Sequence, residues 1–408
     1  MVTWSERDTP PSLPWPTAKI LSALAASAPT LGRSFSINLV PINISRVHPA
    51  VKYARAYIKH GVDIPNYLAL ATRSGCLNQS GSVRVDSYLE DAAYLSPVKV
   101  GNNILFLYPD TGSGDFWAYT RNTPGAATHY VYDTSTGTKL PNQYWHIEYI
   151  DGSTAGGAVY TDKVEVGNVS FSNQAIGIAD YLQSSQVVFT EIIDGMMGLA
   201  FSSLNTVRPT KQPTFYDNVK PSLQTPVFAA YLKHNASGVF DFGFIDSSKY
   251  SGEIVYKDVD SSRGQWNVTL DGYSIGDTFS ASDCFNAIVD TGTSLLLLDH
   301  EIVQNYYAPI PSSQFSLRHG GWIFNCADDI PTFTVKIGPL DVVIPAEYLN
   351  YGSLGTSCYG GLQCSPHNSY GILGDVFLKV LYVIFDDGTT SSPRVGFAKQ
   401  ASLSVPKV

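Results

Sequence analysis

The sequence predicts an all-β dominated protein built from two homologous β lobes. Its 408 residues exceed the size of one typical domain, so two lobes and an accessory segment are expected. The 34 Gly, 24 Pro, 25 Tyr and 19 Phe residues favour many short strands and turns over long helices. A short acidic motif and its downstream partner occur twice, which indicates an internal duplication.

The duplication begins with an acid that directly follows an apolar run. "DTGS" at 110–113 recurs as "DTGT" at 290–293, and in both copies apolar residues resume after the motif. Further downstream, "IDGMMGLAF" at 193–201 recurs loosely as "YGILGDVFL" at 370–378. Turns alone favour Asp and Gly, but a turn does not explain two copies with matching partners. We therefore expect two homologous lobes.

Helices are expected to be few and short. Residues 46–60 carry apolar side chains at helical spacing, and "TFYDNVK" from Thr214 and "IVQNYY" from Ile302 are further candidates. By contrast, residues 104–108 predict a buried strand that the first motif breaks and that "FW" at 116–117 resumes.

Four segments are predicted along the chain: a leader at 1–32, a basic segment at 33–84, an N-terminal lobe at 85–264 and a C-terminal lobe at 265–408. Residues 33–80 carry a net charge of +5, although the whole chain carries −9. One interpretation is a solvated basic arm. The other is that the segment binds the acidic body and is released when carboxylates become protonated.

Composition and motifs exclude several classes of function. The net charge of −9 and the pI near 5.3 argue against nucleic acid as a partner. The longest apolar run, "FLKVLYVIF" from Phe377, is shorter than the ~18 residues of a membrane helix. The sequence has no HExxH, GxSxG, P-loop or CxxC motif, so neither a metal nor another cofactor is expected.

The cysteines allow one disulfide to be suggested. Cys326 and Cys358 lie in the same strand-rich region and can close a loop of about thirty residues. The sequence leaves Cys76, Cys284 and Cys364 unassigned.

Five Asn-x-Ser/Thr sites fit a secreted chain. They are Asn43, Asn78, Asn168, Asn235 and Asn267. A signal peptide is not evident, because the apolar stretch at 20–30 is short and follows a Pro-rich leader. We expect secretion, with an intracellular location as the open alternative.

Two aspartates at the centre of two related lobes have a specific chemistry. If the lobes face one another, Asp110 and Asp290 come together, and two touching carboxyls cannot both ionise. The pair then shares one proton, so that one member acts as a base on a water molecule and the other as an acid. Such a pair needs neither a metal nor a covalent intermediate.

The three residues after each aspartate are expected to support it. A threonine can bind across to the opposing loop, a glycine lets a backbone N–H approach the carboxylate, and a hydroxyl residue can bind its outer oxygen. These supporting residues are Thr111, Gly112, Ser113, Thr291, Gly292 and Thr293.

These residues lead to a known family. The chain resembles the pepsin-like aspartic endopeptidases, most closely the secreted fungal penicillopepsin group. The matching segments are "DTGSGDFW", "IEYIDGSTAGG", "IDGMMGLAFSS", "VFDFGFID", "IVDTGTSLLLLD", "CYGGLQ", "ILGDVFLK", "YVIFD" and "RVGFA". They occur in family order over roughly residues 85–400, so the match is highly specific.

The resemblance implies a bilobal pepsin-like fold with a central cleft and a β-hairpin flap. It assigns Tyr149, Asp151 and Ser153 to the flap and substrate-binding region, with Trp117 as the hydrogen-bond partner of Tyr149. It also implies the disulfide Cys326–Cys358 in the C-terminal lobe. The basic segment would be a propeptide.

The implied activity is peptide-bond hydrolysis at acidic pH by a monomer made as a zymogen. Its partners would be polypeptide substrates and its own propeptide, with neither nucleic acid nor membrane. The chain departs from the family pattern at Pro109, Gly114 and Ile150. The alternative is therefore a non-proteolytic or narrowly specialised protein on the same fold, acting for example in a biosynthetic pathway.

Overall fold

The structure, a computed structural model, describes the chain from Gln79 to Ser402 with five short gaps. The described ranges are 79–88, 91–149, 152–184, 191–277, 279–367 and 369–402. They all belong to one compact unit, Val47–Val408. The predicted leader, the predicted helix at 46–60 and most of the predicted basic segment lie outside the described residues.

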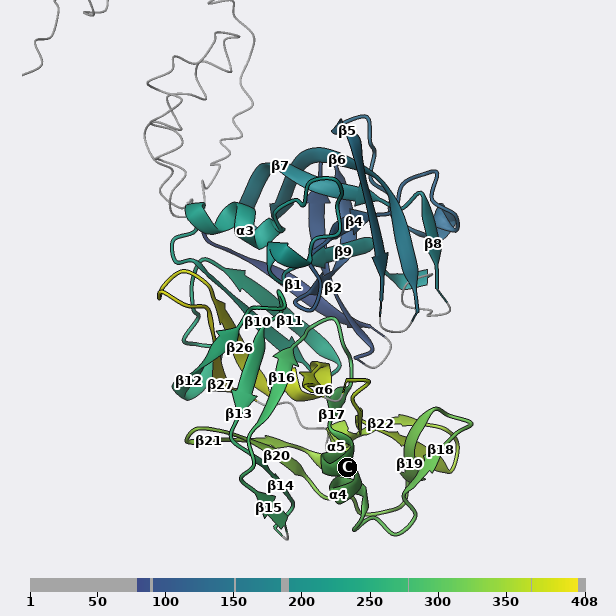
Figure 1. The fold of residues 1–408 in the computed structure, drawn as a ribbon, viewed down its shortest axis with the longest axis vertical. Coiled ribbons are helices and arrows are strands. Elements are labelled where there is room, and N and C mark those ends of the chain that lie inside the picture. Colours follow the sequence, from purple (N-terminus) through teal and green to yellow (C-terminus); the bar gives the residue numbers. More distant parts are fainter. Residues whose placement is uncertain are drawn as a thin grey trace, which may run out of the picture. The chain divides into compact units, whose positions relative to one another are not determined.

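The predicted bilobal, β-dominated fold is confirmed (Figure 1). The strands of the N-terminal half are β1 (Gly81–Tyr88), β2 (Ala93–Val100), β3 (Asn103–Asp110), β4 (Phe116–Ala118), β5 (Thr138–Glu148), β6 (Thr154–Val166), β7 (Val169–Ile178), β8 (Tyr181–Gln183), β9 (Gly195–Gly198), β10 (Val227–Lys233) and β11 (Ala236–Phe242). Its helical turns are η1 (Ala126–Thr128), η3 (Ser202–Leu204), α3 (Phe215–Val219) and η4 (Lys220–Ser222).

The C-terminal half adds two small satellite sheets, β15-β14-β20-β21 and β18-β19-β23-β22. Its strands are β12 (Tyr250–Asp260), β13 (Asn267–Leu270), β14 (Tyr273–Ile275), β15 (Phe279–Ala281), β16 (Phe285–Val289), β17 (Leu296–Leu298), β18 (Gln314–Ser316), β19 (Gly321–Asn325), β20 (Phe333–Ile337), β21 (Leu340–Ile344), β22 (Asn350–Ser353), β23 (Ser357–Gly360), β24 (Leu362–Cys364), β25 (Gly371–Leu373), β26 (Leu381–Asp386) and β27 (Arg394–Gln400). Its helices are α4 (His300–Tyr307), α5 (Ala346–Leu349) and α6 (Asp375–Leu378).

A central antiparallel sheet joins the two halves. Its strands run in the order β1–β11–β10–β26–β27–β12, and β10 and β26 meet in the middle. At this junction Phe228 is the register partner of Phe385, and their rings stack with centroids 4.6 Å apart. Strand β12 pairs with β13 and β27, although it falls within the predicted N-terminal lobe at 85–264. The predicted boundary at 264–265 stays a prediction.

The sequence duplication corresponds to a duplicated arrangement of strands. In the N-terminal half, β9 lies between β3, with which it is parallel, and β4, with which it is antiparallel. In the C-terminal half, β25 lies in the same way between β16 and β17. In each half, the downstream motif therefore forms a strand that pairs with both the strand before and the strand after the Asp-Thr-Gly loop.

The predicted strand at 104–108 is present, but it is not buried throughout. Leu105 and Leu107 are fully buried, whereas 59% of Ile104 is exposed. Alternate residues of a strand point to opposite faces, so an apolar run does not guarantee two buried faces.

The two predicted helices within the described residues are confirmed. Helix α4 begins after Asp299, whose side chain accepts a hydrogen bond from the Glu301 N–H. Its apolar residues from Ile302 to Tyr307 lie on the buried face. Helix α3 is capped in the same way by Thr214, which accepts from the Asp217 N–H.

The disulfide implied by the family resemblance is present between Cys326 and Cys358, with a Cα–Cα distance of 5.0 Å. It links the end of β19 to β23 in one satellite sheet. Within the described residues, Cys284 and Cys364 are free thiols. Cys76 lies outside the described residues.

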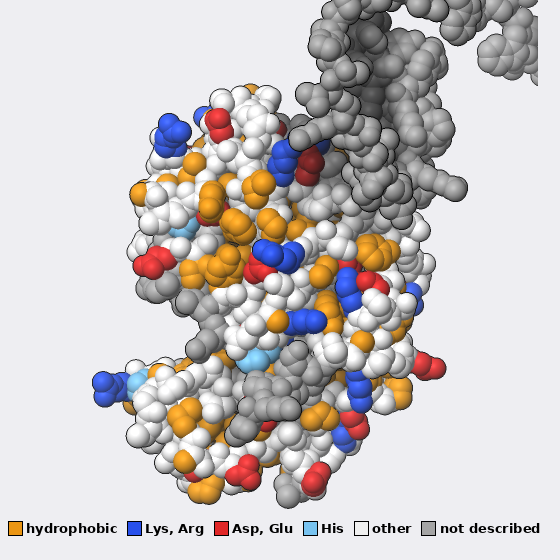
Figure 2. Space-filling view, turned by 180° about the vertical axis from the view of Figure 1, so that it is seen from behind, with side chains coloured by type: hydrophobic (Ala, Val, Ile, Leu, Met, Phe, Trp, Pro, Cys, Tyr) orange, Lys and Arg blue, Asp and Glu red, His pale blue; other side chains and the backbone are white. Residues whose placement is uncertain are grey.

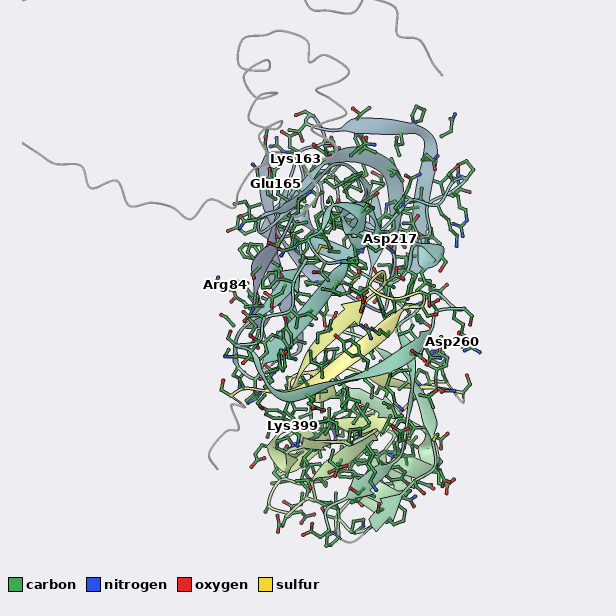
Figure 3. All side chains as sticks on the ribbon, turned by 90° about the vertical axis from the view of Figure 1, so that its left-hand side faces the viewer. Arg84, Lys163, Glu165, Asp217, Asp260 and Lys399 are labelled. Carbon is green, nitrogen blue, oxygen red and sulfur yellow. A yellow bond between two sulfur atoms is a disulfide. The ribbon has the colours of Figure 1, made fainter. Side chains whose placement is uncertain are left out.

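The surface carries few charged groups (Figure 2), in keeping with a content of only 15% charged residues. Lys163 and Glu165, neighbours on β6, form an ion pair of 2.5 Å (Figure 3). Their side chains are 50% and 30% exposed, and such surface pairs typically contribute only about 0–1 kcal/mol. Stability must therefore come mainly from the large core, which extends through both halves.

One buried ion pair ties the two halves together. Asp91 accepts hydrogen bonds from Lys379 Nζ at 2.9 Å and from the Asn235 N–H at 2.8 Å, and His234 Nδ1 lies 2.5 Å from it. Burial opposes ionisation of Asp91, but the Lys379 ammonium and the hydrogen bonds outweigh it and lower its pKa to about 2. Asp91 therefore stays charged at acidic pH.

Asp115 behaves in the opposite way. Its Oδ1 accepts hydrogen bonds from Asn205 Nδ2 at 2.9 Å and from the Thr206 N–H at 3.0 Å. It is only 2% exposed, and burial raises its pKa to about 6 despite the Thr206 hydrogen bond. The folded state therefore binds a proton between about pH 4 and pH 6 that the unfolded chain releases. The contribution of Asp115 to the free energy of unfolding is therefore complete below about pH 4 and is lost as the pH rises through its folded-state pKa.

We expect Asp115→Asn to stabilise the protein at neutral pH and to change little at pH 4. The amide keeps the Oδ1 acceptor and removes a deprotonation that costs on the order of 3 kcal/mol by pH 7. Urea unfolding at pH 4 and pH 7 checks this, with Asp290→Asn included in every sample to prevent the self-cleavage that the family resemblance implies. The exposed Asp258→Asn is the matched control. An unchanged pH dependence in Asp115→Asn would contradict the assignment.

Candidate active site

Each aspartate of the repeated motif lies at the end of a core strand. Asp110 is the last residue of β3, and Asp290 directly follows β16. The partner strands hold both positions from the other side. The Leu199 N–H donates to the Asp110 carbonyl at 2.7 Å, and the Asp290 N–H donates to the Leu373 carbonyl at 3.1 Å. The backbone of both acids is therefore fixed by the core.

Reciprocal threonine hydrogen bonds connect the two motif loops. The Thr111 N–H donates to Thr291 Oγ1 at 3.1 Å, and the Thr291 N–H donates to Thr111 Oγ1 at 3.0 Å. The hydroxyls donate onward to the opposite lobe, Thr111 to the Val289 carbonyl and Thr291 to the Pro109 carbonyl, both at 2.8 Å. Pro109 takes part through its carbonyl, so its missing N–H does not weaken this network.

The residues after each aspartate bind its carboxylate in the same pattern. In both loops the glycine N–H donates to Oδ1 of the aspartate at 2.8 Å. The next residue donates its hydroxyl to Oδ2, from Ser113 to Asp110 and from Thr293 to Asp290 at 2.7 Å. The orientation of both carboxylates is therefore set within their own loops.

The two carboxylates also lie against the opposite loops. A Cβ atom added to Gly112 would collide with the Asp290 carboxylate, and one added to Gly292 would collide with the Asp110 carboxylate. Glycine is required at both positions because any side chain would push the acids apart. The structure thus brings Asp110 and Asp290 together at the junction of the lobes.

The environment of this dyad favours retention of a proton. Asp110 and Asp290 are 5% and 7% exposed. Burial, and then the neighbouring Asp290 carboxylate, raise the pKa of Asp110 to about 8, against the hydrogen bonds from Ser113 and Gly112. Two touching acids that share one proton can serve as acid and base together.

The hairpin of β5 and β6 carries the predicted flap residues. Trp117 Nε1 donates to Tyr149 Oη at 2.9 Å, as the resemblance implies. The Tyr149 N–H donates to the Ser153 carbonyl at 2.8 Å and closes the turn. Ser153 Oγ also lies 2.7 Å from Ser184 Oγ on the segment after β8. Asp151 and Ile150 lie outside the described residues.

Two buried residues near the dyad were not identified from the sequence. Met196 contacts both Tyr149 and Ser113 through its sulfur. Asp375 is fully buried, and burial and then the Asp290 carboxylate raise its pKa well above the usual range. The sequence does hold one indication that Asp375 is unusual. It is an acid at the position where the first repeat has the apolar Leu199.

The described residues contain no group of three or more His, Cys, Asp or Glu side chains placed to hold a metal ion. No helix in the described part of the chain is long and apolar enough to cross a membrane. The site presents two carboxyl groups that hydroxyl and backbone N–H donors hold in orientation.

Comparison with known proteins supports the family that the sequence resembles. The family model described as eukaryotic aspartyl protease matches residues 93–400. Penicillopepsin-1 of Talaromyces stipitatus is 49% identical over 387 residues, covering 94% of this chain and 98% of the relative. Aspergillopepsin-1 of Aspergillus oryzae is 44% identical over 391 residues, covering 94% and 97%.

The fold also matches a solved structure. The crystal structure of aspartic proteinase from Irpex lacteus superposes with a TM-score of 0.66, covering 79% of this chain and 98% of that one. At 24% identity this match speaks for the fold alone. The sequence relatives support a protease rather than the non-proteolytic alternative. The chain belongs to the eukaryotic aspartyl protease family and is an aspartic endopeptidase that hydrolyses polypeptides.

Proposed function

We propose that Asp110 and Asp290 are the catalytic pair of this endopeptidase. The observation that supports this most directly is the mutual fit in which each carboxylate lies against the glycine of the opposite loop. A water molecule between the acids is deprotonated by the ionised member as it attacks the peptide carbonyl. The protonated member gives its proton to the carbonyl oxygen. The member that took the proton of the water then passes it to the leaving nitrogen as the C–N bond breaks, and the other member recovers a proton from a hydroxyl of the tetrahedral intermediate.

Asp110→Asn and Asp290→Asn are each expected to lower kcat by on the order of 10³-fold or more, because each removes one partner of the proton exchange. Hydrolysis of a fluorogenic peptide library between pH 3 and 6, with and without a statine-type inhibitor, measures this. The control is Asp115→Asn, another buried acid close in sequence that does not contact the pair. Activity retained in either dyad variant would refute the assignment.

The raised pKa of Asp110 predicts how activity depends on pH. The shared proton is present below this pKa and is lost as the pH rises through it, so activity falls on the alkaline side. The predicted working range therefore lies below about pH 8 and includes acidic pH. A profile of kcat/KM that rises steadily from pH 4 to pH 9 would be incompatible with a shared proton.

We further propose that the basic segment is a propeptide removed on the N-terminal side of Gln79. Gln79 is bound on several sides. Its N–H donates to the Ser222 carbonyl at 2.7 Å, its carbonyl accepts from the Gln224 N–H at 2.9 Å, and its Oε1 accepts from the Ser170 N–H at 2.7 Å. From Gly81 onward, β1 pairs with β11. Cleavage within this bonded stretch would break these contacts, so they favour a site at 75–78, before the 84–85 boundary predicted from the sequence.

Incubation of the full chain at acidic pH is expected to yield a product that begins at or before Gln79. Intact-mass analysis and N-terminal sequencing identify the new end. Asp290→Asn should stay full length alone and be cut when a trace of active enzyme is added, which separates self-processing from a contaminating protease. A product that begins after Arg84, or an active protein of unchanged mass, would contradict the proposal.

Secretion is proposed on the placement of the glycosylation motifs. Asn168 and Asn235 are exposed in the turns between β6 and β7 and between β10 and β11. Asn267 is half-buried in β13, which is paired on both sides. A glycan fits the first two positions and not the third.

Protein from the culture medium of a eukaryotic host is expected to lose mass on treatment with an N-glycosidase. Asn168→Gln and Asn235→Gln should each remove one glycan, and Asn267→Gln should remove none. Secreted protein without glycans at Asn168 and Asn235 would contradict this placement.

A further inference from the structure

Met196 lies between the strand that ends in Asp110 and the strand that carries Trp117. On β9 it is the register partner of Tyr108 in β3 on one side and of Trp117 in β4 on the other. It is only 2% exposed. It packs with Trp117 and Trp145 in a second cluster of buried side chains, which lies within the N-terminal half and is separate from the large core that extends through both halves. Its backbone position is therefore fixed from both sides.

The thioether of Met196 faces two hydroxyl groups that belong to different parts of the site. Tyr149 Oη, on the flap, lies 3.3 Å from Met196 Sδ, and Ser113 Oγ, in the dyad loop, lies 3.6 Å from it. Thioether sulfur is a weak acceptor and cannot donate. Either hydroxyl can therefore hydrogen-bond the sulfur only by donating its own proton to it.

The available donors and acceptors fix which group donates in the contact between Tyr149 and Met196. Trp117 Nε1 can only donate, so its 2.9 Å hydrogen bond uses Tyr149 Oη as the acceptor. The Tyr149 hydroxyl in turn donates to the sulfur. The result is a chain that runs from Trp117 through Tyr149 to Met196.

Ser113 has one hydroxyl proton and two acceptors within reach. It donates to Asp110 Oδ2, or it turns to Met196 Sδ. When Oδ2 of Asp110 carries a proton, that proton can be donated to Ser113, and the Ser113 proton can pass to the sulfur. With Met196 in place, Ser113 thus has an acceptor in both protonation states of the acid, Asp110 when it is ionised and the sulfur when it is protonated.

We propose that Met196 is a positioning residue whose sulfur joins the flap tyrosine to the dyad serine. It does not touch the reacting atoms. It holds the Tyr149 hydroxyl over the dyad loop and lets Ser113 adapt to the protonation of Asp110. The inference rests on the catalytic role proposed above for Asp110 and Asp290.

Met196→Leu tests this, because leucine conserves volume and apolarity and removes the acceptor. We expect a loss in kcat/KM of about threefold to tenfold, from two weak hydrogen bonds. The alkaline limb of the kcat profile should also move to lower pH. Without the sulfur Ser113 donates only to Asp110, which favours the ionised acid and lowers its pKa.

The neighbouring methionine provides the matched control. Met197 is also fully buried on β9, but it packs in the other core cluster. Met197→Leu should change thermal stability at most and should leave kcat/KM and the pH profile within about twofold of the parent. Equal losses in the two variants would show that packing, rather than the sulfur, is responsible, and would overturn the proposal.

Two further measurements keep the test decisive if Met196→Leu folds poorly. The chain has three methionines, Met1, Met196 and Met197. In the Met197→Leu background, biosynthetic replacement of methionine by norleucine therefore changes only Met1 and Met196, and replaces sulfur by a methylene. It should reproduce the loss in kcat/KM and the pH shift.

The second measurement is a double-mutant cycle with Tyr149→Phe. The effect of Met196→Leu should shrink by at least half in that background, since the tyrosine proton is already absent. Full additivity, or norleucine protein with the parent's pH profile, would overturn the role of the sulfur. Asp290→Asn measured in parallel reports on the dyad itself, so failure of one proposal can be told from failure of the other.

Discussion

The arrangement of this protein depends on the reciprocal hydrogen bonds of Thr111 and Thr291. Each threonine uses its backbone N–H and its hydroxyl to reach the opposite loop, so four bonds cross the junction within a fully buried site. Buried donors and acceptors of this kind are costly to leave unpaired. Any displacement of one lobe at this point would break several bonds together, and the separation of the two carboxylates is held within narrow limits.

Around this symmetric centre the two halves differ where the chemistry requires it. The same strand arrangement occurs twice, yet Met196 of the first copy corresponds to Ile372 of the second, and Leu199 corresponds to Asp375. At the first of these positions, a sulfur-containing side chain, Met196, occurs only in the half that carries the flap. At the second, a buried acid, Asp375, occurs only in the half that contributes Lys379. A duplicated scaffold therefore supplies equal geometry to both aspartates, and a few substitutions make their surroundings unequal.

The sequence was sufficient for the repeat, the paired aspartates and the helices at 214–220 and 302–307, because each rests on a local pattern. The apolar run at 104–108 misled on burial, since a run of apolar residues does not tell which face of a strand is covered. Met196 could not be recognised as a neighbour of the dyad, and the only signal for Asp375 was the acid that replaces Leu199 in the second repeat. Their contacts join residues far apart in the chain, such as Tyr149 and Met196, 47 positions apart, and depend on side-chain directions that no spacing rule supplies.

The threonine contact has a consequence for the timing of activity during biosynthesis. Its partners are 180 residues apart in the chain, and β10 of the first half pairs with β26 near the end of the second. Contacts of such long range form late and slowly, since they require closure of a long loop. A nascent chain that has not yet reached residue 290 has one aspartate loop without its counterpart. Completion of synthesis and folding is thus itself a safeguard, because a partly made chain has no means of cutting its neighbours.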